Sequence, residues 1–583
     1  MYLDMINDAK DVKKLNIKEL RELAKEVREA ILKRDSIIGG HVGPNLGMVD
    51  ATIAMHYVFN SPVDKIVFDV SHQCYAHKII TGRKYGYLNP EEYSKVSGYT
   101  NFKESEHDHF IVGHTSTSVS LASGLAKARD IKGKNHNVIA IIGDGSLSGG
   151  EALEGLNFAG SELNSNFIVV VNDNQMSIAE NHGGLYNNLE LLRKTNGMAE
   201  LNMFKALGFD YKYLDDGNDI EKLIDVFMEV KDTKKPVVVH LNTIKGKGYK
   251  FAQENKEPWH WSMPFDVETG KLKVEINEKV QNYNDITYDV LKNKIDKKED
   301  IVVVCAGTPG VFGLTKDRRE ELGKNYVDVG IAEEHAVAMS SALAKGGVKP
   351  VFCVMSSFIQ RTYDQLSQDL ALNKNGAVIL VYWGGISGAD ATHLCCFDMA
   401  MMNSIPNLIC LSPTTKQEYL AMLNGALEQN DNPVIIRVPN FVVEGREISD
   451  DWQTLISSQV VEKGDTVAIL GLGGMFYHAQ KVANELKVKG LNPTLINLRR
   501  YNDIDEKLLK NLKENHRIVV SIEDGVLEGA NGGNIARFYG DSDVKVLCYG
   551  MKKEFSDSVS VDVLYHKNRL DVEQIVEDIL NNI

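Results

Sequence analysis

Short apolar runs recur along the 583-residue chain and alternate with amphipathic segments. Runs of this kind, rich in Val and Ile, are typical of parallel strands whose two faces are both covered by helices. The pattern therefore predicts an α/β fold of doubly wound, mostly parallel sheets. The clearest runs are VIAIIG (138–143), FIVVVND (167–173), KPVVVHLNT (235–243), IVVVCAG (301–307), KPVFCVMS (349–356), AVILVYW (377–383), PNLICLSP (406–413), PVIIRVP (433–439), TVAILGLG (466–473) and RIVVSIED (517–524).

These runs are too many for one sheet, and they fall into three clusters. The clusters are separated by more polar stretches, EINEKVQNYNDI and GREISDDWQT, and no long Pro, Gly or Ser linker joins them. We therefore expect three closely packed domains, at residues 1–285, 286–452 and 453–583.

Composition excludes several classes of function. Asp and Glu total 80 against 65 Lys and Arg, a net charge of −15, which argues against a surface for nucleic acid. No apolar run approaches the ~18 residues that span a bilayer. The seven cysteines are scattered, without a C-x-x-C pair, and are typical of reduced thiols. We expect a cytoplasmic protein that binds neither nucleic acid nor membrane.

Two polar turns follow neighbouring predicted strands. Gly143-Asp144-Gly145 ends one strand and precedes a helix expected to begin near Ser148, and Asn172-Asp173-Asn174 ends the next. Ligands bind at the carboxyl ends of strands in open α/β sheets. A carboxylate and an amide oxygen suit Mg²⁺, and glycines let backbone N–H groups approach an anion. Each turn alone is also consistent with an ordinary loop.

Together the two turns resemble the Mg²⁺–diphosphate motif of thiamine diphosphate (ThDP) enzymes. In the transketolase-like branch, a glutamate of a separate domain hydrogen-bonds the aminopyrimidine ring of ThDP and so activates the cofactor. The segment YVDVGIAEEHAVAMSSALAKGG makes Glu333 the candidate. Phe358, in MSSFIQRTYDQ, matches the aromatic residue that stacks on that ring.

Further segments narrow the resemblance, which covers nearly the whole chain. GGHVGPNLGMVDATIAMHYVFNSP, FDVSHQCYAHKIITGR and VGHTSTSVSLASGLAKA are similar to motifs of the 1-deoxy-D-xylulose 5-phosphate synthases. The resemblance implies that pyruvate is decarboxylated on ThDP and joined to D-glyceraldehyde 3-phosphate, a step that supplies isoprenoid and thiamine biosynthesis. It also implies a homodimer.

Site residues follow from the same resemblance, position by position. It implies catalytic roles for Glu333, His41, His260 and His393; ThDP contacts by His72, Gly113, His114, Thr115, Gly145, Ser146, Asn174, Tyr249, Glu333 and Phe358; Mg²⁺ ligation by Asp144, Asn174 and the carbonyl of Met176; and substrate binding by Arg361, Asp390 and Arg437.

The acceptor half departs from the family pattern. Trp383 and Asn440 stand where the resemblance implies arginines that clamp the aldehyde phosphate, and Met355 replaces a tyrosine. Each lost arginine removes charge-assisted hydrogen bonds of roughly 1.5–3 kcal/mol, or about one to two decades of affinity. The segment Gly388–His393 is also one residue shorter than the family's.

Three functions remain open on the sequence. The first is the synthase reaction with glyceraldehyde 3-phosphate. The second is a related enzyme that uses another aldehyde, or a ketol donor as transketolases do, which the missing arginines motivate. The third is a ThDP-binding regulatory or structural protein without turnover.

Overall fold

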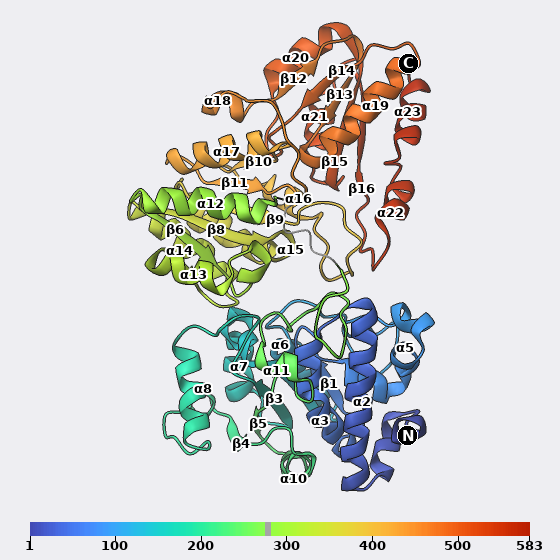
Figure 1. Cartoon of the computed structure of the whole chain (residues 1–583), viewed down its shortest axis with the longest axis vertical. Helices are drawn as coiled ribbons and strands as arrows, with labels where there is room; N and C mark the ends of the chain where they lie inside the picture. The colour runs from blue at the N-terminus through green and yellow to red at the C-terminus, as the bar shows by residue number, and fades with distance from the viewer. Residues whose placement is uncertain (275–280) are drawn as a thin grey trace. The chain divides into compact units, whose positions relative to one another are not determined.

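A computed structural model describes residues 1–274 and 281–583. The chain forms two compact units: Met1–Asn277 with Gly330–Ala332, and Glu278–Val329 with Glu333–Ile583. Figure 1 shows helices and strands alternating along most of the chain, as an α/β fold requires.

The first unit contains a five-stranded parallel sheet in the order β1-β2-β3-β5-β4. Its central strands are buried along almost their whole length because helices cover both faces. The strands are β1 (Lys65–Phe68), β2 (Val138–Gly143), β3 (Phe167–Asp173), β4 (Asp210–Leu214) and β5 (Pro236–Asn242). The helices are α1 (Tyr2–Met5), α2 (Ile17–Ile38), α3 (Val42–Val58), α4 (Tyr75–Lys78), α5 (Tyr85–Leu88), α6 (Ser118–Ile131), α7 (Gly150–Glu162), α8 (Gly184–Lys194), α9 (Met203–Ala206), α10 (Ile220–Val230) and α11 (Lys250–Glu254).

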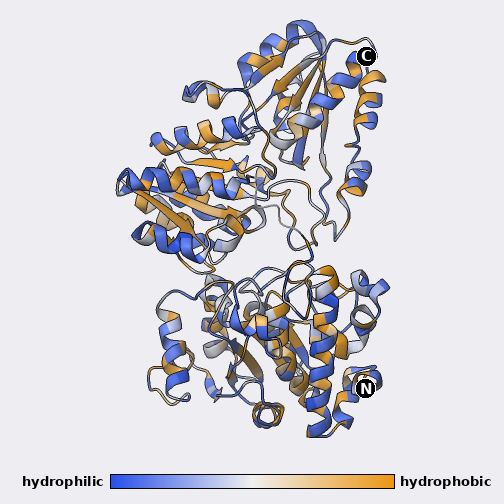
Figure 2. Cartoon of the chain, in the orientation of Figure 1, coloured by the Kyte–Doolittle hydropathy of each residue, from blue (hydrophilic) through white to orange (hydrophobic). Residues whose placement is uncertain are grey.

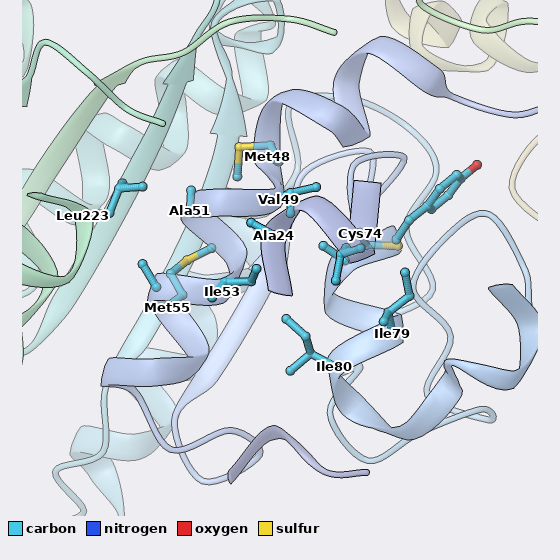
Figure 3. Close-up of a cluster of buried hydrophobic side chains, with 14 of the residues drawn as sticks. Ala24, Met48, Val49, Ala51, Ile53, Met55, Cys74, Ile79, Ile80 and Leu223 are labelled. Atoms are coloured by element: carbon cyan, nitrogen blue, oxygen red, sulfur yellow. The ribbon is translucent and has the colours of Figure 1, made fainter. Parts of the chain in front are cut away.

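Two hydrophobic clusters lie on opposite faces of this sheet. Helices α2, α3 and α10 pack on one face, and α6 and α7 on the other. Figure 3 shows part of the first cluster, where Met48, Val49 and Ile53 of α3 lie near Ala24 of α2. Helix α3 is buried along nearly its full length, and Gly43 in its first turn accepts a backbone hydrogen bond from Gly246, which follows β5.

The second unit contains two sheets that share one hydrophobic cluster. The first has the order β10-β11-β9-β8-β6-β7 and is parallel; the second has the order β12-β14-β13-β15-β16 and is parallel except for β12. The strands are β6 (Ile301–Cys305), β7 (Tyr326–Asp328), β8 (Lys349–Met355), β9 (Val378–Tyr382), β10 (Ile409–Leu411), β11 (Val434–Arg437), β12 (Gln459–Glu462), β13 (Thr466–Gly471), β14 (Thr494–Asn497), β15 (His516–Val526) and β16 (Lys545–Met551).

Helices again cover the sheets of this unit, and Figure 2 shows apolar strands between helices whose other faces are hydrophilic. The helices are α12 (Tyr283–Asp296), α13 (Lys316–Leu322), α14 (Glu333–Lys345), α15 (Ser356–Ile359), α16 (Asp398–Met402), α17 (Lys416–Glu428), α18 (Trp452–Leu455), α19 (Phe476–Val488), α20 (Glu506–Asn515), α21 (Asn531–Tyr539), α22 (Val561–Lys567) and α23 (Val572–Leu580).

The predicted fold class is confirmed by these three sheets, and each predicted strand is present. The helix expected near Ser148 begins at Gly150, because Asp144–Ser148 first form a 3₁₀ turn. The predicted domain limits at 285 and 452 fall at the starts of α12 and α18, and the limits themselves stay a prediction. Within the described residues, no helix combines the length and the hydropathy needed to cross a membrane.

Candidate active site

Asp144 and Asn174 lie at the carboxyl ends of adjacent strands, where Gly143 of β2 pairs with Asn172 of β3. Both side chains are buried. Asp144 Oδ2 accepts a hydrogen bond of 2.7 Å from Asn181, whereas Asn174 Oδ1 has no hydrogen-bond partner among the described residues. Burial, and secondarily the charge of Asp173, raises the pKa of Asp144 to about 7.

These two residues fit a hard divalent cation. A buried oxygen without a partner is costly, and a bound ion with oxygen ligands would satisfy it. Met176, whose carbonyl is the third predicted ligand, is half-buried and follows Gln175, which has a positive φ of 66°. Among the described residues no cluster of three His, Cys, Asp or Glu side chains offers another metal site.

Asp173, between these residues in the motif, has a different role. Its carboxylate accepts hydrogen bonds from His240 Nε2 at 2.8 Å, Arg193 Nη1 at 2.5 Å and the backbone N–H of Gln175 at 3.1 Å. Burial favours the neutral acid, but the His240 and Arg193 contacts outweigh it and lower the pKa of Asp173. Asp173 therefore anchors the turn that carries Asn174.

The turn after β2 also brings backbone close to other segments. A Cβ at Gly145 would lie 2.6 Å from Ser177 Oγ, so only glycine allows this approach. Ser146 is buried, and its carbonyl accepts a hydrogen bond of 2.8 Å from Ser116 Oγ. Asp69, which follows β1, accepts from the backbone N–H groups of Ser116 and Ser118.

The Asp69 carboxylate fixes residues 116–118, which directly follow the predicted ThDP contacts Gly113, His114 and Thr115. Gly113 is buried, and His114 and Thr115 are half-buried. Asp69 is a positioning residue that the sequence reasoning missed.

Three predicted histidines come together in the first unit. The ring centroids of His41 and His72 are 5.1 Å apart, those of His72 and His260 are 5.2 Å apart and stacked, and those of His41 and His260 are 5.8 Å apart. Asn45 of α3 donates from Nδ2 to the carbonyls of His41 at 2.7 Å and His72 at 2.6 Å. Asn45 thus fixes two of the three backbone positions, and the sequence reasoning missed it as well.

Lys245 lies beside this cluster, just after β5. Its side chain is 1% exposed, and its Nζ lies 2.6 Å from the carbonyl oxygen of Ser177 and 3.1 Å from His260 Nδ1. Burial lowers the pKa of Lys245 to about 7, although the charge of Asp144 acts in the opposite direction. Burial, and next the Lys245 charge, lowers the pKa of His260 well below its ordinary value.

Tyr249, a predicted ThDP contact, is buried in an aromatic cluster. Its ring makes edge contacts with Phe251 and Trp259, and its hydroxyl donates to the Val267 carbonyl at 3.1 Å. Burial raises the pKa of the Tyr249 phenol to about 12.

In the second unit, Glu333 is the first residue of α14 and is 3% exposed. Its Oε2 lies 3.7 Å from Arg361 Nη1 and has no hydrogen-bond partner among the described residues. Burial raises the pKa of Glu333 to about 7, and Arg361 opposes that shift.

Phe358 and His393 lie near each other, with ring centroids 5.9 Å apart. His393 Nδ1 contacts the Asp390 carboxylate at 3.3 Å. Burial alone would raise the pKa of Asp390, but hydrogen bonds from His393 and Thr392 outweigh it and lower the pKa to about 2.

Arg437, predicted to bind substrate, is engaged with two carboxylates of its own unit. Its Nε lies 2.9 Å from Asp398 Oδ2, and its Nη1 lies 2.6 Å from Asp524 Oδ1. The guanidinium is buried, and a Cβ at Gly384 would lie 2.6 Å from it. Arg437 would have to exchange these carboxylates before it could bind a phosphate.

The two positions that lack the expected arginines are linked through one loop. Asn440 Nδ2 donates to the Gly384 carbonyl at 3.2 Å. Trp383, next to Gly384, is 52% exposed and has a positive φ of 63°. The described contacts of both residues therefore include no cation that replaces the missing arginines.

Comparison with known families covers almost the whole chain. The model described as 1-deoxy-D-xylulose-5-phosphate synthase matches residues 3–203. Transketolase models match the thiamine diphosphate binding domain at 112–299, the pyrimidine binding domain at 279–442 and the C-terminal domain at 457–575.

Curated relatives agree with these matches. The protein from Caldanaerobacter subterraneus subsp. tengcongensis is 38% identical over 99% of this chain and 98% of its own, and that from Shouchella clausii is 36% identical over 100% and 99%. The protein from Listeria monocytogenes is 37% identical over 97% and 94%. All three are named 1-deoxy-D-xylulose-5-phosphate synthase. The chain therefore belongs to the 1-deoxy-D-xylulose-5-phosphate synthase family of transketolase-like, ThDP-dependent transferases.

Proposed function

We propose that this chain joins pyruvate, with loss of CO₂, to D-glyceraldehyde 3-phosphate, giving 1-deoxy-D-xylulose 5-phosphate for isoprenoid precursors. The family match favours this reaction over a transketolase-type exchange and over a protein without turnover. The observation that carries the proposal is Glu333, whose buried Oε2 lacks a hydrogen-bond partner among the described residues. Such an oxygen suits a ligand that donates to it.

The first unit would hold ThDP and Mg²⁺. Asp144, Asn174 and the Met176 carbonyl would ligate the cation, which shares oxygen ligands with phosphates. Backbone groups of Gly145 and Ser146 would bind the diphosphate. The remaining contacts with the cofactor would come from His72, Gly113, His114, Thr115 and Tyr249.

When bound, ThDP supplies an electron sink for the electron pair that remains as pyruvate loses CO₂. Glu333 would share a proton with the aminopyrimidine through Oε2, and Phe358 would stack on that ring. A pKa of about 7 suits Glu333 to this work, because a group that shares protons acts best near the working pH.

Histidines would serve the substrates. His41 and His260 in the first unit and His393 in the second would donate or accept protons at the substrate oxygens. Arg361 and Asp390 would bind the substrates, with Arg437 as the third predicted contact. Asp390 contacts His393 at 3.3 Å, an arrangement that would orient the imidazole.

The test measures CO₂ release from pyruvate by the ThDP- and Mg²⁺-loaded protein, with and without glyceraldehyde 3-phosphate. We expect the triose phosphate to accelerate release and 1-deoxy-D-xylulose 5-phosphate to form. Unphosphorylated glyceraldehyde and a ketose phosphate donor are the comparison substrates. Faster turnover with either one than with the proposed pair would contradict the assignment and support the alternative acceptor or donor.

We also propose a cytoplasmic homodimer. The seven cysteines are all unpaired, which agrees with a reducing compartment. Light scattering coupled to size-exclusion chromatography tests the assembly, and a mass close to one 64.8 kDa chain would contradict it.

A further inference from the structure

The cluster formed by His41, His72 and His260 lies beside a buried cation, Lys245, that has no role in the proposed reaction. Lys245 is almost completely buried, and it contacts a ring nitrogen of His260 instead of a carboxylate. A buried lysine is uncommon unless it is paired or has a specific task. Its surroundings therefore indicate what it does.

Three segments hold this lysine in a fixed position. Gly43 donates its backbone N–H to the Trp259 carbonyl at 2.8 Å and accepts one from Gly246 at 2.9 Å. Gly40 and Ser262 exchange two backbone hydrogen bonds of 2.9 Å each. The start of α3, the residues after β5 and the segment around His260 thus form one hydrogen-bonded unit.

The lysine stem fills the space that glycines leave on α3. A Cβ at Gly43 would lie 3.3 Å from Lys245 Cγ and 2.9 Å from the Trp259 carbonyl oxygen. A Cβ at Gly47 would lie 3.0 Å from the Ile244 carbonyl oxygen. Because the stem is enclosed, the ammonium group has little freedom to leave His260.

Both close neighbours of the ammonium group accept hydrogen bonds. An ammonium has three donors and no acceptor, so a hydrogen bond to His260 requires a lone pair on Nδ1. The Ser177 carbonyl favours a proton on His260, but its oxygen accepts a hydrogen bond of 2.6 Å from Lys245 and so has only one lone pair left for the ring. A proton on Nδ1 would point at the lysine N–H groups.

We infer that Lys245 is a positioning residue that holds His260 as a neutral imidazole with its proton on Nε2. This narrows the role proposed above for His260: its ring donates a hydrogen bond to a substrate oxygen and takes no proton there. This role rests on the proposed function, which includes His260 in the active site. The ring nitrogen that donates is the one that does not contact Lys245.

The primary test is ¹⁵N-histidine NMR of the full chain without cofactor at pH 5.5. That pH is well below the pKa of about 7 of Lys245, so nearly all of the lysine carries its charge. The spectrum of His260→Gln assigns the His260 signals. We expect a neutral ring with an unprotonated Nδ1 and a protonated Nε2. An imidazolium, or a proton on Nδ1, overturns the inference without any variant of Lys245.

Three variants test whether the lysine causes this state. Lys245→Met keeps an unbranched stem but removes the donor, and it should lower the ratio of Nε2–H to Nδ1–H forms by ~10–100-fold, the value of a charged hydrogen bond. Lys250→Met makes the same change at an exposed lysine of α11 and should leave the ratio unchanged. Lys245→Arg keeps a charged donor and should retain the Nε2–H form.

ThDP titration separates this role from direct cofactor binding. If Lys245→Met weakens ThDP binding and leaves the His260 tautomer unchanged, the lysine is a cofactor ligand and the inference is overturned. A correct tautomer in a protein without synthase activity would count against the proposed function alone, because the NMR measurement requires no turnover.

Discussion

The residues at the ends of β2 and β3 and the residues around Arg437 are both buried and charged, but they differ in what remains unsatisfied. In the first region Asn174 Oδ1 has no hydrogen-bond partner among the described residues, and the pKa of Asp144 is raised to about 7. In the second, the Arg437 guanidinium contacts both Asp398 and Asp524. The first region therefore has oxygen atoms that a bound cation would stabilise, whereas in the second region the cation already contacts two carboxylates of the protein.

A residue can match a family pattern because it binds a ligand or because it stabilises the fold, and this difference separates the two cases. Burial of Asp144 and Asn174 carries a desolvation cost that the hydrogen bond from Asn181 to Asp144 offsets only in part, and a bound ligand would offset the rest. Burial acts to lower the pKa of Arg437, but Asp398 and Asp524 outweigh it and raise the pKa, so the charge is stabilised by the fold itself. Glu333, with its unpartnered Oε2, belongs with the first group although it lies in the second unit.

The largest expected effect is at Glu333. Glu333→Gln keeps the shape of the side chain but removes its ability to exchange a proton, so kcat for CO₂ release from pyruvate should fall ~10²–10⁴-fold. Steady-state kinetics with saturating ThDP and Mg²⁺ measures it. Glu334→Gln, the same change at the half-buried neighbour, is the matched control and should have little effect. Equal losses in both variants would assign the effect to the start of α14 instead of to Oε2.

The next effect concerns Arg437 and is one of stability. Arg437→Met leaves Asp398 buried without its cation, and removing one partner of a buried pair typically costs ~3–5 kcal/mol. Denaturant unfolding monitored in the second unit measures the change. Arg446→Met, at an exposed arginine, should stay within about 0.5 kcal/mol of wild type.

Unchanged stability combined with weaker substrate binding in Arg437→Met would contradict the conclusion that Arg437 serves the fold. If stability is unchanged and the KM for glyceraldehyde 3-phosphate rises instead, Arg437 is a substrate ligand, and its two carboxylate contacts exchange for phosphate during turnover.

The fold was predictable where strands are covered on both sides. Every strand named from the sequence is present, whereas β1, β4, β7, β12, β14 and β16 are not among the ten clearest runs, and all of these except β14 lie at sheet edges. An edge strand is covered less completely, so its residues need not be uniformly apolar. β4, with the sequence DYKYL, and β12, with QVVE, are largely exposed or half-exposed and carry charged residues.

The site residues were predictable where a single short motif contains both the strand and the side chain proposed to bind the metal. Asp144 and Asn174 follow apolar strands directly, so their shared edge could be inferred. Lys245 was missed because no local sequence pattern connects it to its partner, His260. Asn45 was missed for the same reason, since its partners are the backbone carbonyls of His41 and His72. Asp69 was missed with β1, the strand that it follows. The carboxylates of Arg437 likewise come from distant segments.

A smaller effect is expected at the proposed Mg²⁺ site. Asn174→Ala removes a direct ligand, and because loss of even an outer partner of a metal site costs ~10–100-fold in affinity, ThDP affinity in the presence of Mg²⁺ should fall at least that far. Calorimetric titration measures it. Asn242→Ala makes the same change at the end of β5, where the side chain donates to the Asp215 carbonyl, and should leave ThDP affinity near wild type. A chelator should abolish the difference between Asn174→Ala and wild type, and a difference that persists without Mg²⁺ would argue against ligation.

The smallest expected effect restores charge to the acceptor half. Trp383→Arg returns a guanidinium to a position where the family pattern has one, but this position is 52% exposed. Solvent weakens an exposed ionic contact, so we expect a gain of only ~0.5–1.5 kcal/mol, or a ~2–12-fold lower KM for glyceraldehyde 3-phosphate. Trp383→Gln separates the gain of charge from the loss of the indole ring. The KM for unphosphorylated glyceraldehyde should not change in Trp383→Arg, because the added charge has no phosphate to bind there. An equal improvement with both aldehydes would show that the indole obstructs the acceptor, and that the missing charge at this position is not what distinguishes this chain.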